Sequence, residues 1–468
     1  MRPLLALCMF VAVAAVCPAA DPQLSVGFAD ADVSPNVGGK TPVYMAGFGT
    51  NRVATKLHDP IMARAVVLSD GTKKIALVSV DVVGLFLPAV ERVRAKVKGF
   101  DHVMVSSTHN HEGPDTLGLW GKSNFVSGVD PDYLTAVVDG CAKAIAAAEK
   151  KLTPATARVG TAAGPELLRD GRQPEVKHDT MVTILFEAKN AKENAAPLGL
   201  LVQWNVHPEL LDDKNTEVSA DHVGYTVKHL KDKYKCPVAY FTGTVGGLMT
   251  NLGVPLKDDK GNELKDGTFA KTEKYGVEVG KLAEKAVAAG KEATLVPFDI
   301  RTRAVLAPVD NNLYKLAWAA GVLSRTMYDW TGDPTPKEFK EAKDPGKPVG
   351  VKTEVGYLKL GELDVACIPG EIYPELVLDK IQDPADKGAD FPDAPKEPGI
   401  YPQLKGKYRM IVGLANDEIG YILPKRQWDE KAPYCYGLKK AQYGEINSCG
   451  PEVAKVICEA FKGLVEAK

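Results

Sequence analysis

The sequence predicts an α/β fold, of mixed α+β type, in one large domain whose mixed β-sheets are flanked by helices. Two observations predict it. Short apolar runs of strand length alternate along the chain with longer helix-like stretches. No shift in composition divides the chain, although it is long enough to bury a sizeable core. Hydrophobic residues make up 45% and charged residues 25%, as in ordinary globular proteins.

The predicted strands are apolar runs of about five to eight residues, the usual length of a strand in a globular sheet. The clearest of them are Ala65 to Ser69, Ile75 to Val80, Val103 to Ser107, Met181 to Phe186, and Leu198 to Asn205.

The predicted helices are longer stretches in which apolar residues recur at helical spacing. Pro/Lys/Asp-rich patches at 332–347 and 383–398 are typical of surface loops within one domain. The helices are expected at Pro131 to Lys150, Val223 to Tyr234, Lys271 to Ala289, and Asn311 to Tyr328.

The N-terminus has the pattern of a signal peptide. Arg2 precedes an apolar run from Leu4 to Val16, and small residues follow at 17–20. We therefore expect residues 1–20 to be removed and 21–468 to form the mature protein, either periplasmic or secreted. Cys17 would also suit a lipoprotein, but Val16 stands where a small residue is expected, so lipid anchoring is the less favoured hypothesis.

Charge argues against nucleic acid as a partner, and hydropathy argues against a membrane-spanning helix. The formal net charge is −2 and the pI is near 6.5, so no overall basic field would hold nucleic acid or attract an anionic membrane. After the N-terminal run, no stretch approaches the roughly 20 apolar residues of a spanning helix. We expect no transmembrane span, and the sequence does not indicate an oligomeric state.

Six cysteines follow the predicted signal peptide, without the paired spacing of a zinc ribbon. In an oxidising compartment, Cys435 and Cys449 are close enough in sequence to close a short disulfide loop. Buried free thiols are the alternative, and the sequence does not decide between them.

Histidines follow two of the predicted strands. The run Val103 to Ser107 leads into His109 and His111, which share a face if the strand continues. Imidazole suits zinc, so the pair indicates a metal site, with an exposed loop pair as the alternative. His207 follows a second apolar run, although a lone histidine in such a place is more often a core or loop residue.

A carboxylate completes this pattern. The run Asp364 to Ile368 ends in Pro369-Gly370-Glu371, so Glu371 also stands at a strand exit. Three strand ends therefore each present one side chain able to bind a metal.

Together these and other motifs resemble the N-terminal catalytic domain of the neutral/alkaline non-lysosomal ceramidase family. The resemblance spans most of the mature sequence. Its motifs are Ala31-Asp32-Val33-Ser34-Pro35, Tyr44-Met45-Ala46-Gly47-Phe48, His58-Asp59-Pro60, Ala63-Arg64-Ala65, Ser107 to Pro114, His207-Pro208, Ser219-Ala220-Asp221 with Gly224-Tyr225, and Pro369-Gly370-Glu371.

The resemblance implies a zinc amidohydrolase with Zn²⁺ held by His109, His207, Glu371 and a tyrosine, which is Tyr421 in the segment 413–424. Such a set leaves room for water at the metal. The bound water would be driven toward hydroxide near neutral pH and would attack an amide or ester carbonyl.

Three further catalytic residues are expected. His111 is the candidate acid/base or oxyanion donor, with a supporting role beside the ligands as the alternative. The resemblance places Arg169 roughly at the family's substrate-polarising arginine, a role for which Arg172 competes. Tyr443 is a weaker match, because the family's Tyr-Glu-Gly-Ala-Ser pattern is altered here.

The chain departs from the family in two places. The segment 243–251 lacks the serine that the family carries there, so a serine nucleophile is unsupported whereas a zinc-water route is unaffected. The chain ends at Lys468, so we expect no C-terminal immunoglobulin-like domain.

The resulting hypothesis is an exported zinc-dependent amidohydrolase that cleaves an N-acyl amide bond in a small-molecule or lipid substrate. One alternative keeps the metal but assigns a peptide, a sugar amide or an ester as substrate. Another is an exported binding protein with a degenerate catalytic site. A deep apolar pocket would favour a lipid, and an open charged one the other substrates.

Overall fold

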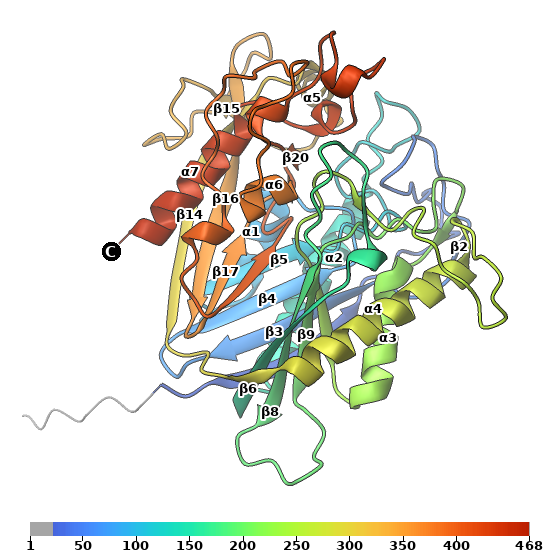
Figure 1. Ribbon diagram of the computed structural model, residues 1–468, viewed down its shortest axis with the longest axis vertical. Coiled ribbons are helices and arrows are strands. Elements are labelled where there is room, and N and C mark those ends of the chain that lie inside the picture. The colour runs from blue at the N-terminus through green and yellow to red at the C-terminus, as the bar shows by residue number, and fades with distance from the viewer. Residues whose placement is uncertain (1–21, 468) are drawn as a thin grey trace, which may run out of the picture.

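The computed structural model describes residues 22–467, which fold into four layers, with two β-sheets packed face to face between outer helices (Figure 1). The predicted signal peptide lies outside the described residues. In the larger sheet the strand order is β11-β9-β8-β6-β1-β3-β4-β5, and β13 pairs with β6. Its strands are β1 (Ser25–Asp32), β3 (Met62–Ser69), β4 (Lys74–Val80), β5 (His102–Ser107), β6 (Thr153–Ala163), β8 (Thr180–Ala188), β9 (Gly199–Trp204), β11 (Val238–Thr242) and β13 (Lys291–Ala293).

The smaller sheet has the order β14-β16-β17-β19, with β15 paired to β16. Its neighbours β17 and β19 run parallel, as do β4 with β5 and β9 with β11 in the larger sheet. The strands are β14 (Phe298–Val309), β15 (Met327–Asp329), β16 (Val349–Leu360), β17 (Leu363–Cys367) and β19 (Tyr408–Val412).

Strict alternation along the strands builds the central core. On β3, Val66 and Leu68 pack toward the smaller sheet, whereas Ala65 and Val67 pack toward the helices. On β17, Val365 joins the same central cluster from the other side. Residues from both halves of the chain therefore share one core, which confirms the predicted mixed fold in one unit.

Helices cover both outer faces. Apolar residues of α1 (Leu87–Lys96), α2 (Pro131–Glu149), α3 (Asp221–Tyr234) and α4 (Phe269–Ala289) pack on the larger sheet. Those of α6 (Pro374–Leu378) and α7 (Val453–Glu466) pack on the smaller one. The helix α5 (Asn312–Ala319) lies at one end of the molecule, beside the C-terminal loops (Figure 1).

Short pairings tie the connecting loops together. Three two-stranded ladders join β2 to β10, β7 to β12 and β18 to β20. These strands are β2 (Lys56–Leu57), β7 (Arg169–Asp170), β10 (Glu217–Val218), β12 (Met249–Thr250), β18 (Glu371–Ile372) and β20 (Tyr421–Ile422), and 3₁₀ turns occur at Pro165–Leu167, Tyr401–Gln403, Lys425–Gln427, Cys435–Gly437 and Glu445–Asn447.

All five predicted strands and three of the four predicted helices are confirmed, with small shifts at their ends. The fourth helix, predicted over Asn311 to Tyr328, is wrong in its second half. It ends at Ala319, because Gly321 adopts a left-handed φ of 72° that terminates the helix. Met327 then pairs with Val351 as part of β15.

The cysteines after residue 21 are all free thiols, and all are buried. Cys435 and Cys449 are therefore not joined by a disulfide in this structure. Burial raises the pKa of each of these two thiols to about 12, so neither is a ready nucleophile. Among residues 22–467, no helix combines the length and the apolar character needed to cross a membrane.

Candidate metal centre

The four predicted metal ligands all follow strands. His109 comes after β5 and His207 after β9, both in the larger sheet. Glu371 comes after β17 and Tyr421 after β19, both in the smaller sheet, and these two residues are direct partners in the pairing of β18 with β20. The C-terminal ends of four strands therefore point to one place between the sheets.

The side chains converge there. The Nε2 atoms of His207 and His109 lie 3.0 and 3.2 Å from the same carboxylate oxygen, Oε2 of Glu371. The Tyr421 hydroxyl lies 3.4 Å from Nε2 of His207. All four residues are at most 6% exposed, so the structure brings the whole predicted set together in a buried site.

Backbone carbonyls orient both imidazoles. Nδ1 of His109 lies 2.7 Å from the carbonyl oxygen of Val83, and Nδ1 of His207 lies 3.0 Å from that of Met249. Each Nδ1 must donate its proton to form these hydrogen bonds. A neutral ring then presents the Nε2 lone pair to the shared point, as metal-binding histidines do.

These distances fit a metal ion. Donor atoms bound tetrahedrally to zinc lie about 3.4 Å from one another, and the distances here are 3.0 to 3.4 Å. Without a cation, Glu371 would accept from two Nε2–H groups, which requires two imidazolium rings with centroids 4.7 Å apart. A bound cation removes that repulsion, so the residues present suit one.

The electrostatics of the site follow from burial and the Glu371 charge. Burial lowers the pKa of His207, but hydrogen bonding and the charge of Glu371 outweigh it and raise that pKa to about 9. The pKa of His109 is raised by the same carboxylate against its burial. Burial would raise the pKa of Glu371, yet the two histidines hold it well below its usual range. Burial, with Glu371 adding to it, keeps the pKa of the Tyr421 phenol well above 10.

His111 lies beside the ligands. The nitrogens of His109, His111 and His207 form a group within 4.8 Å, and Nδ1 of His111 is 3.6 Å from Oε2 of Glu209. Burial, with the charges of the other two histidines, holds the pKa of His111 well below its ordinary value. At neutral pH the ring is therefore uncharged, with one of its two nitrogens unprotonated.

The segment that carries these histidines is tightly held. His109 adopts a left-handed φ of 67°, an uncommon conformation for a residue with a side chain. The side-chain Nδ2 of Asn110 donates to the backbone carbonyl of Ser219 at 2.8 Å. Its Oδ1 accepts from the backbone N–H of Glu112 at 3.0 Å. Such hydrogen bonds stabilise the strained turn that aims His109 at the site.

Glu418 lies at the site although no sequence motif indicates it. A carboxylate oxygen of Glu418 lies within 4.8 Å of donor atoms of His109 and Glu371, and its Oε1 accepts from the Gly420 amide at 2.6 Å. Burial, with the nearby Glu371 charge, raises the pKa of Glu418 well above its usual range, so it holds a proton. Glu418 lies in the segment 413–424 together with Tyr421, but its spacing from the other candidate ligands does not indicate that it belongs to the site.

Tyr443 lies at the edge of the site. Its ring meets that of Tyr421 edge to face, with centroids 5.8 Å apart, while the residue as a whole remains 47% exposed. Burial of the hydroxyl, with the Glu371 charge, raises the Tyr443 pKa to about 12. Tyr443 therefore links the buried Tyr421 to the protein surface.

The two arginines occupy different environments. Arg169 is exposed and donates to the carbonyl of Leu252 at 3.2 Å. Arg172 is buried, pairs with both carboxylate oxygens of Glu445 at 2.7 and 2.8 Å, and donates to the Tyr443 carbonyl at 3.0 Å. Arg172 therefore anchors the segment of Tyr443, and a substrate-polarising arginine remains a prediction for Arg169.

The loop that lacks the family's serine supports the site. The Met249 carbonyl accepts from both the amide and Nδ1 of His207, and the Gly246 amide donates to the Ile372 carbonyl at 3.0 Å. A Cβ at Gly246 would press on Tyr373 and on the Glu371 backbone. This loop thus positions two of the candidate ligands.

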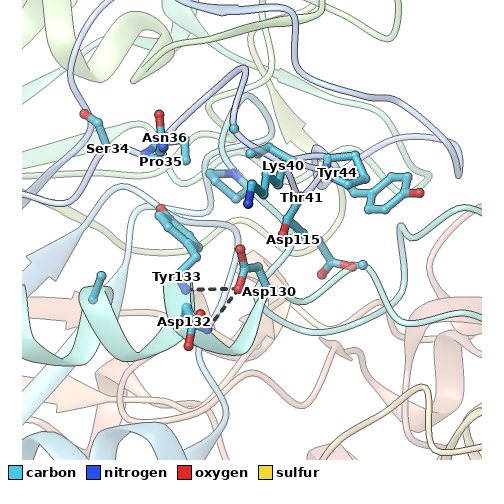
Figure 2. A pocket seen from close by; sticks show the side chains of 16 residues that line it. Ser34, Pro35, Asn36, Lys40, Thr41, Tyr44, Asp115, Asp130, Asp132 and Tyr133 are labelled. Atoms are coloured by element: carbon cyan, nitrogen blue, oxygen red, sulfur yellow. Dashed lines mark hydrogen bonds between the residues drawn. The ribbon is translucent and has the colours of Figure 1, made fainter.

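A separate cavity of about 330 Å³ lies between residues 34–44 and the start of α2 (Figure 2). Asp130, which lines it, caps α2 by accepting from the amides of Asp132 and Tyr133. No candidate metal ligand lines this cavity. Its mixed polar and apolar lining therefore does not bear on the substrate of the metal centre.

The four-layer fold and the converging imidazole and carboxylate donors define a protein with a buried metal-type centre at the ends of its strands. Residues 24–253 match the family described as neutral/alkaline non-lysosomal ceramidase, N-terminal. The matched region, just under half of the chain, carries that family's N-terminal domain, and the match supports a ceramidase-like amidohydrolase.

Solved structures show the same fold. The neutral ceramidase from Pseudomonas aeruginosa aligns with a TM-score of 0.70 and 17% identity, over 95% of this chain and 74% of that one. A structure described as ceramidase complexed with C2 aligns with a TM-score of 0.70 and 17% identity, over 95% and 75%.

Proposed function

We propose that this protein is an exported, zinc-dependent amidohydrolase that cleaves the N-acyl amide bond of a ceramide-like lipid. One observation carries the proposal: Nε2 atoms of His109 and His207 meet a single oxygen of Glu371 at 3.2 and 3.0 Å, with the Tyr421 hydroxyl beside them. The family match supports the reaction class, and the signal-peptide pattern of residues 1–20 supports export.

His109, His207, Glu371 and Tyr421 would hold the ion. Zinc, when bound there, polarises a carbonyl and lowers the pKa of water, which supplies a nucleophile at neutral pH. Two neutral imidazoles and one carboxylate leave a net positive charge at the centre, which favours attack on an uncharged amide.

The surrounding residues supply proton transfer. His111, whose Nδ1 lies 3.6 Å from Oε2 of Glu209, would take up a proton on the ring and return it to the leaving amine. Glu418, within 4.8 Å of donor atoms of His109 and Glu371, would offer its carboxyl group to the substrate or to the ion. The Tyr443 side chain, exposed and in contact with Tyr421, would bind the polar head of the substrate. Because the loop at 243–251 has no serine, a covalent acyl-enzyme on that loop is unsupported, and the nucleophile in this proposal is water.

The test combines zinc content with hydrolysis of a panel of fluorogenic N-acyl-sphingosines. The wild type is compared with His109→Ala and Glu371→Ala, and with His229→Ala as a matched control, since His229 pairs with Glu284 away from the site. We expect about one zinc per chain, and loss of zinc and turnover in the two site variants alone.

Other outcomes would change the conclusion. Zinc without turnover on any sphingosine amide would keep the site and move the substrate to another amide or an ester. No zinc, even after addition of the metal, would favour the binding-protein alternative. N-terminal sequencing of the mature protein from the producing cells tests export, since cleavage near residue 20 is expected.

A further inference from the structure

Exposed apolar side chains gather in three segments. Among the described residues, every strongly exposed large hydrophobic side chain except Leu57 lies in 118–128, 312–322 or 436–446. We call these three segments together the apolar rim. Its exposed members are Phe125, Val126, Leu313, Leu316, Tyr436, Leu438, Tyr443 and Ile446.

The three segments adjoin. The Asn311 amide at the start of α5 donates to the carbonyl of Ile446 at 2.8 Å. A Cβ on Gly118 would overlap the carbonyl oxygen of Val322, just after α5, so these backbones are in contact. Figure 1 shows α5 next to the C-terminal loops at the same end of the molecule. The three segments therefore form one connected region of the surface, and exposed apolar side chains gathered in one region mark interaction sites.

The helix α5 is apolar on two faces. Tyr314 and Trp318 pack against the core of the smaller sheet, while Leu313 and Leu316 are 56% and 54% exposed. No residue of α5 is fully buried. Leucines facing outward from a helix that already has an apolar inner face indicate a second apolar environment.

The rim also carries positive charge without exposed negative charge. Within its segments the only acidic residue is Glu445, which is buried and paired with Arg172. Lysines flank the apolar side chains at 122, 315, 439 and 440. In a chain with 60 acidic and 58 basic residues, such a segregated surface matches anionic headgroups.

The surface is continuous with the metal centre. Tyr443 belongs to the rim and also contacts Tyr421 of the candidate ligand set. We propose that the apolar rim docks the protein onto an anionic lipid surface, so that Tyr443 faces the lipid and the amide enters without crossing water. The inference rests on the proposed function for its substrate, but docking itself is measured without catalysis.

Binding is tested by flotation with vesicles of phosphatidylcholine alone and of phosphatidylcholine mixed with phosphatidylglycerol. The variants are Leu313→Ser with Leu316→Ser, and Lys439→Ala with Lys440→Ala. The matched control is Leu57→Ser, an exposed leucine, 41% accessible, outside the rim. All of these side chains face solvent, so the thermal midpoint should stay near that of the wild type.

We expect the wild type to bind the mixed vesicles more tightly than phosphatidylcholine alone. The double leucine variant should lose at least about tenfold in partitioning, and the double lysine variant should lose about tenfold on the anionic vesicles only. Leu57→Ser should bind like the wild type. Turnover of a soluble short-chain amide should be unchanged in the leucine variant, while turnover of vesicle-borne substrate falls.

Unchanged vesicle binding in the leucine variant, or absence of binding by the wild type, would overturn the inference. A dimer in sedimentation that the leucine variant abolishes would also overturn it, because the rim would then be covered by a second copy. If vesicle binding follows these expectations but no sphingosine amide is cleaved, the docking surface stands and the proposed function fails.

Discussion

Glu371 and Tyr421 face each other as direct partners in the parallel pairing of β18 with β20. The Glu371 amide donates to the Gly420 carbonyl at 3.1 Å, so the backbone itself sets the carboxylate beside the phenol. Two candidate ligands far apart in sequence are thereby held in one short ladder. This arrangement allows one donor to be altered without moving the other.

Tyr421→Phe removes the phenol oxygen but keeps the ring that packs against Tyr373 and Tyr443. We expect normal folding and retained zinc, because two imidazoles and a carboxylate remain. The value of kcat/KM should fall by about 100- to 1,000-fold as an electrostatic contact with the reacting groups is lost. Zinc analysis and steady-state kinetics on the same preparation check this. Full activity in the variant would exclude Tyr421 from the site chemistry.

Gly47→Ala should disrupt His111. Gly47 has a φ of 94°, and a Cβ there would overlap the His111 ring. We expect a loss of about 1–3 kcal/mol in the free energy of unfolding and a large fall in kcat, measured by denaturant titration and kinetics. Gly49→Ala is the matched control, because no atom lies within 4 Å of a Cβ at that position. Equal effects of the two substitutions would contradict the packing argument.

Two buried histidines should make the protein sensitive to acid. Burial lowers the pKa of His102 to about 4 and that of His178 to about 3, whereas the unfolded chain has a histidine pKa near 6.5. The unfolded state therefore binds protons first, and stability is lost as the pH falls from about 6.5 toward 4. For His102 alone the loss amounts to about 3 kcal/mol at pH 4.

His102→Gln removes that titration. Denaturant titrations across this pH range should show a shallower decline in unfolding free energy for the variant than for the wild type. Parallel declines would show that His102 does not titrate as its burial implies.

The two arginines can be distinguished by substitution. Arg172→Ala leaves Glu445 buried without its partner, so we expect a loss of about 3 kcal/mol or more in stability. Arg169→Ala removes an exposed side chain and should change stability by less than about 1 kcal/mol. If Arg169 polarises the substrate, its variant loses kcat while remaining stable. Thermal unfolding and kinetics on both variants decide between a catalytic and a structural arginine.

Much of the site was predictable because each donor follows a strand. The apolar runs before His109 and His207 predict the strands, and the Pro-Gly turn before Glu371 predicts the end of a third strand. The parallel neighbours β17 and β19 then bring the exits that lead to Glu371 and Tyr421 to one edge of the smaller sheet, whereas β5 and β9 are not neighbours in the larger sheet. Tyr421 was predictable only through resemblance to the family.

The remaining parts depend on tertiary contacts that no local pattern encodes. The carbonyls of Val83 and Met249 that orient the imidazoles are backbone atoms of ordinary apolar residues. Glu418 joins the site only because its loop folds back beside Glu371. The helix predicted to reach Tyr328 stops early because Gly321 takes a left-handed conformation, which the apolar periodicity around it conceals.

The candidate ligands are divided between the two sheets, with His109 and His207 from the larger and Glu371 and Tyr421 following strands of the smaller. Neither half of the chain carries a complete donor set. A bound ion would therefore link the two sheets through their side chains. If the chain is cleaved in the connection near residue 295, each of the two fragments should be inactive. Zinc should strengthen their reassociation.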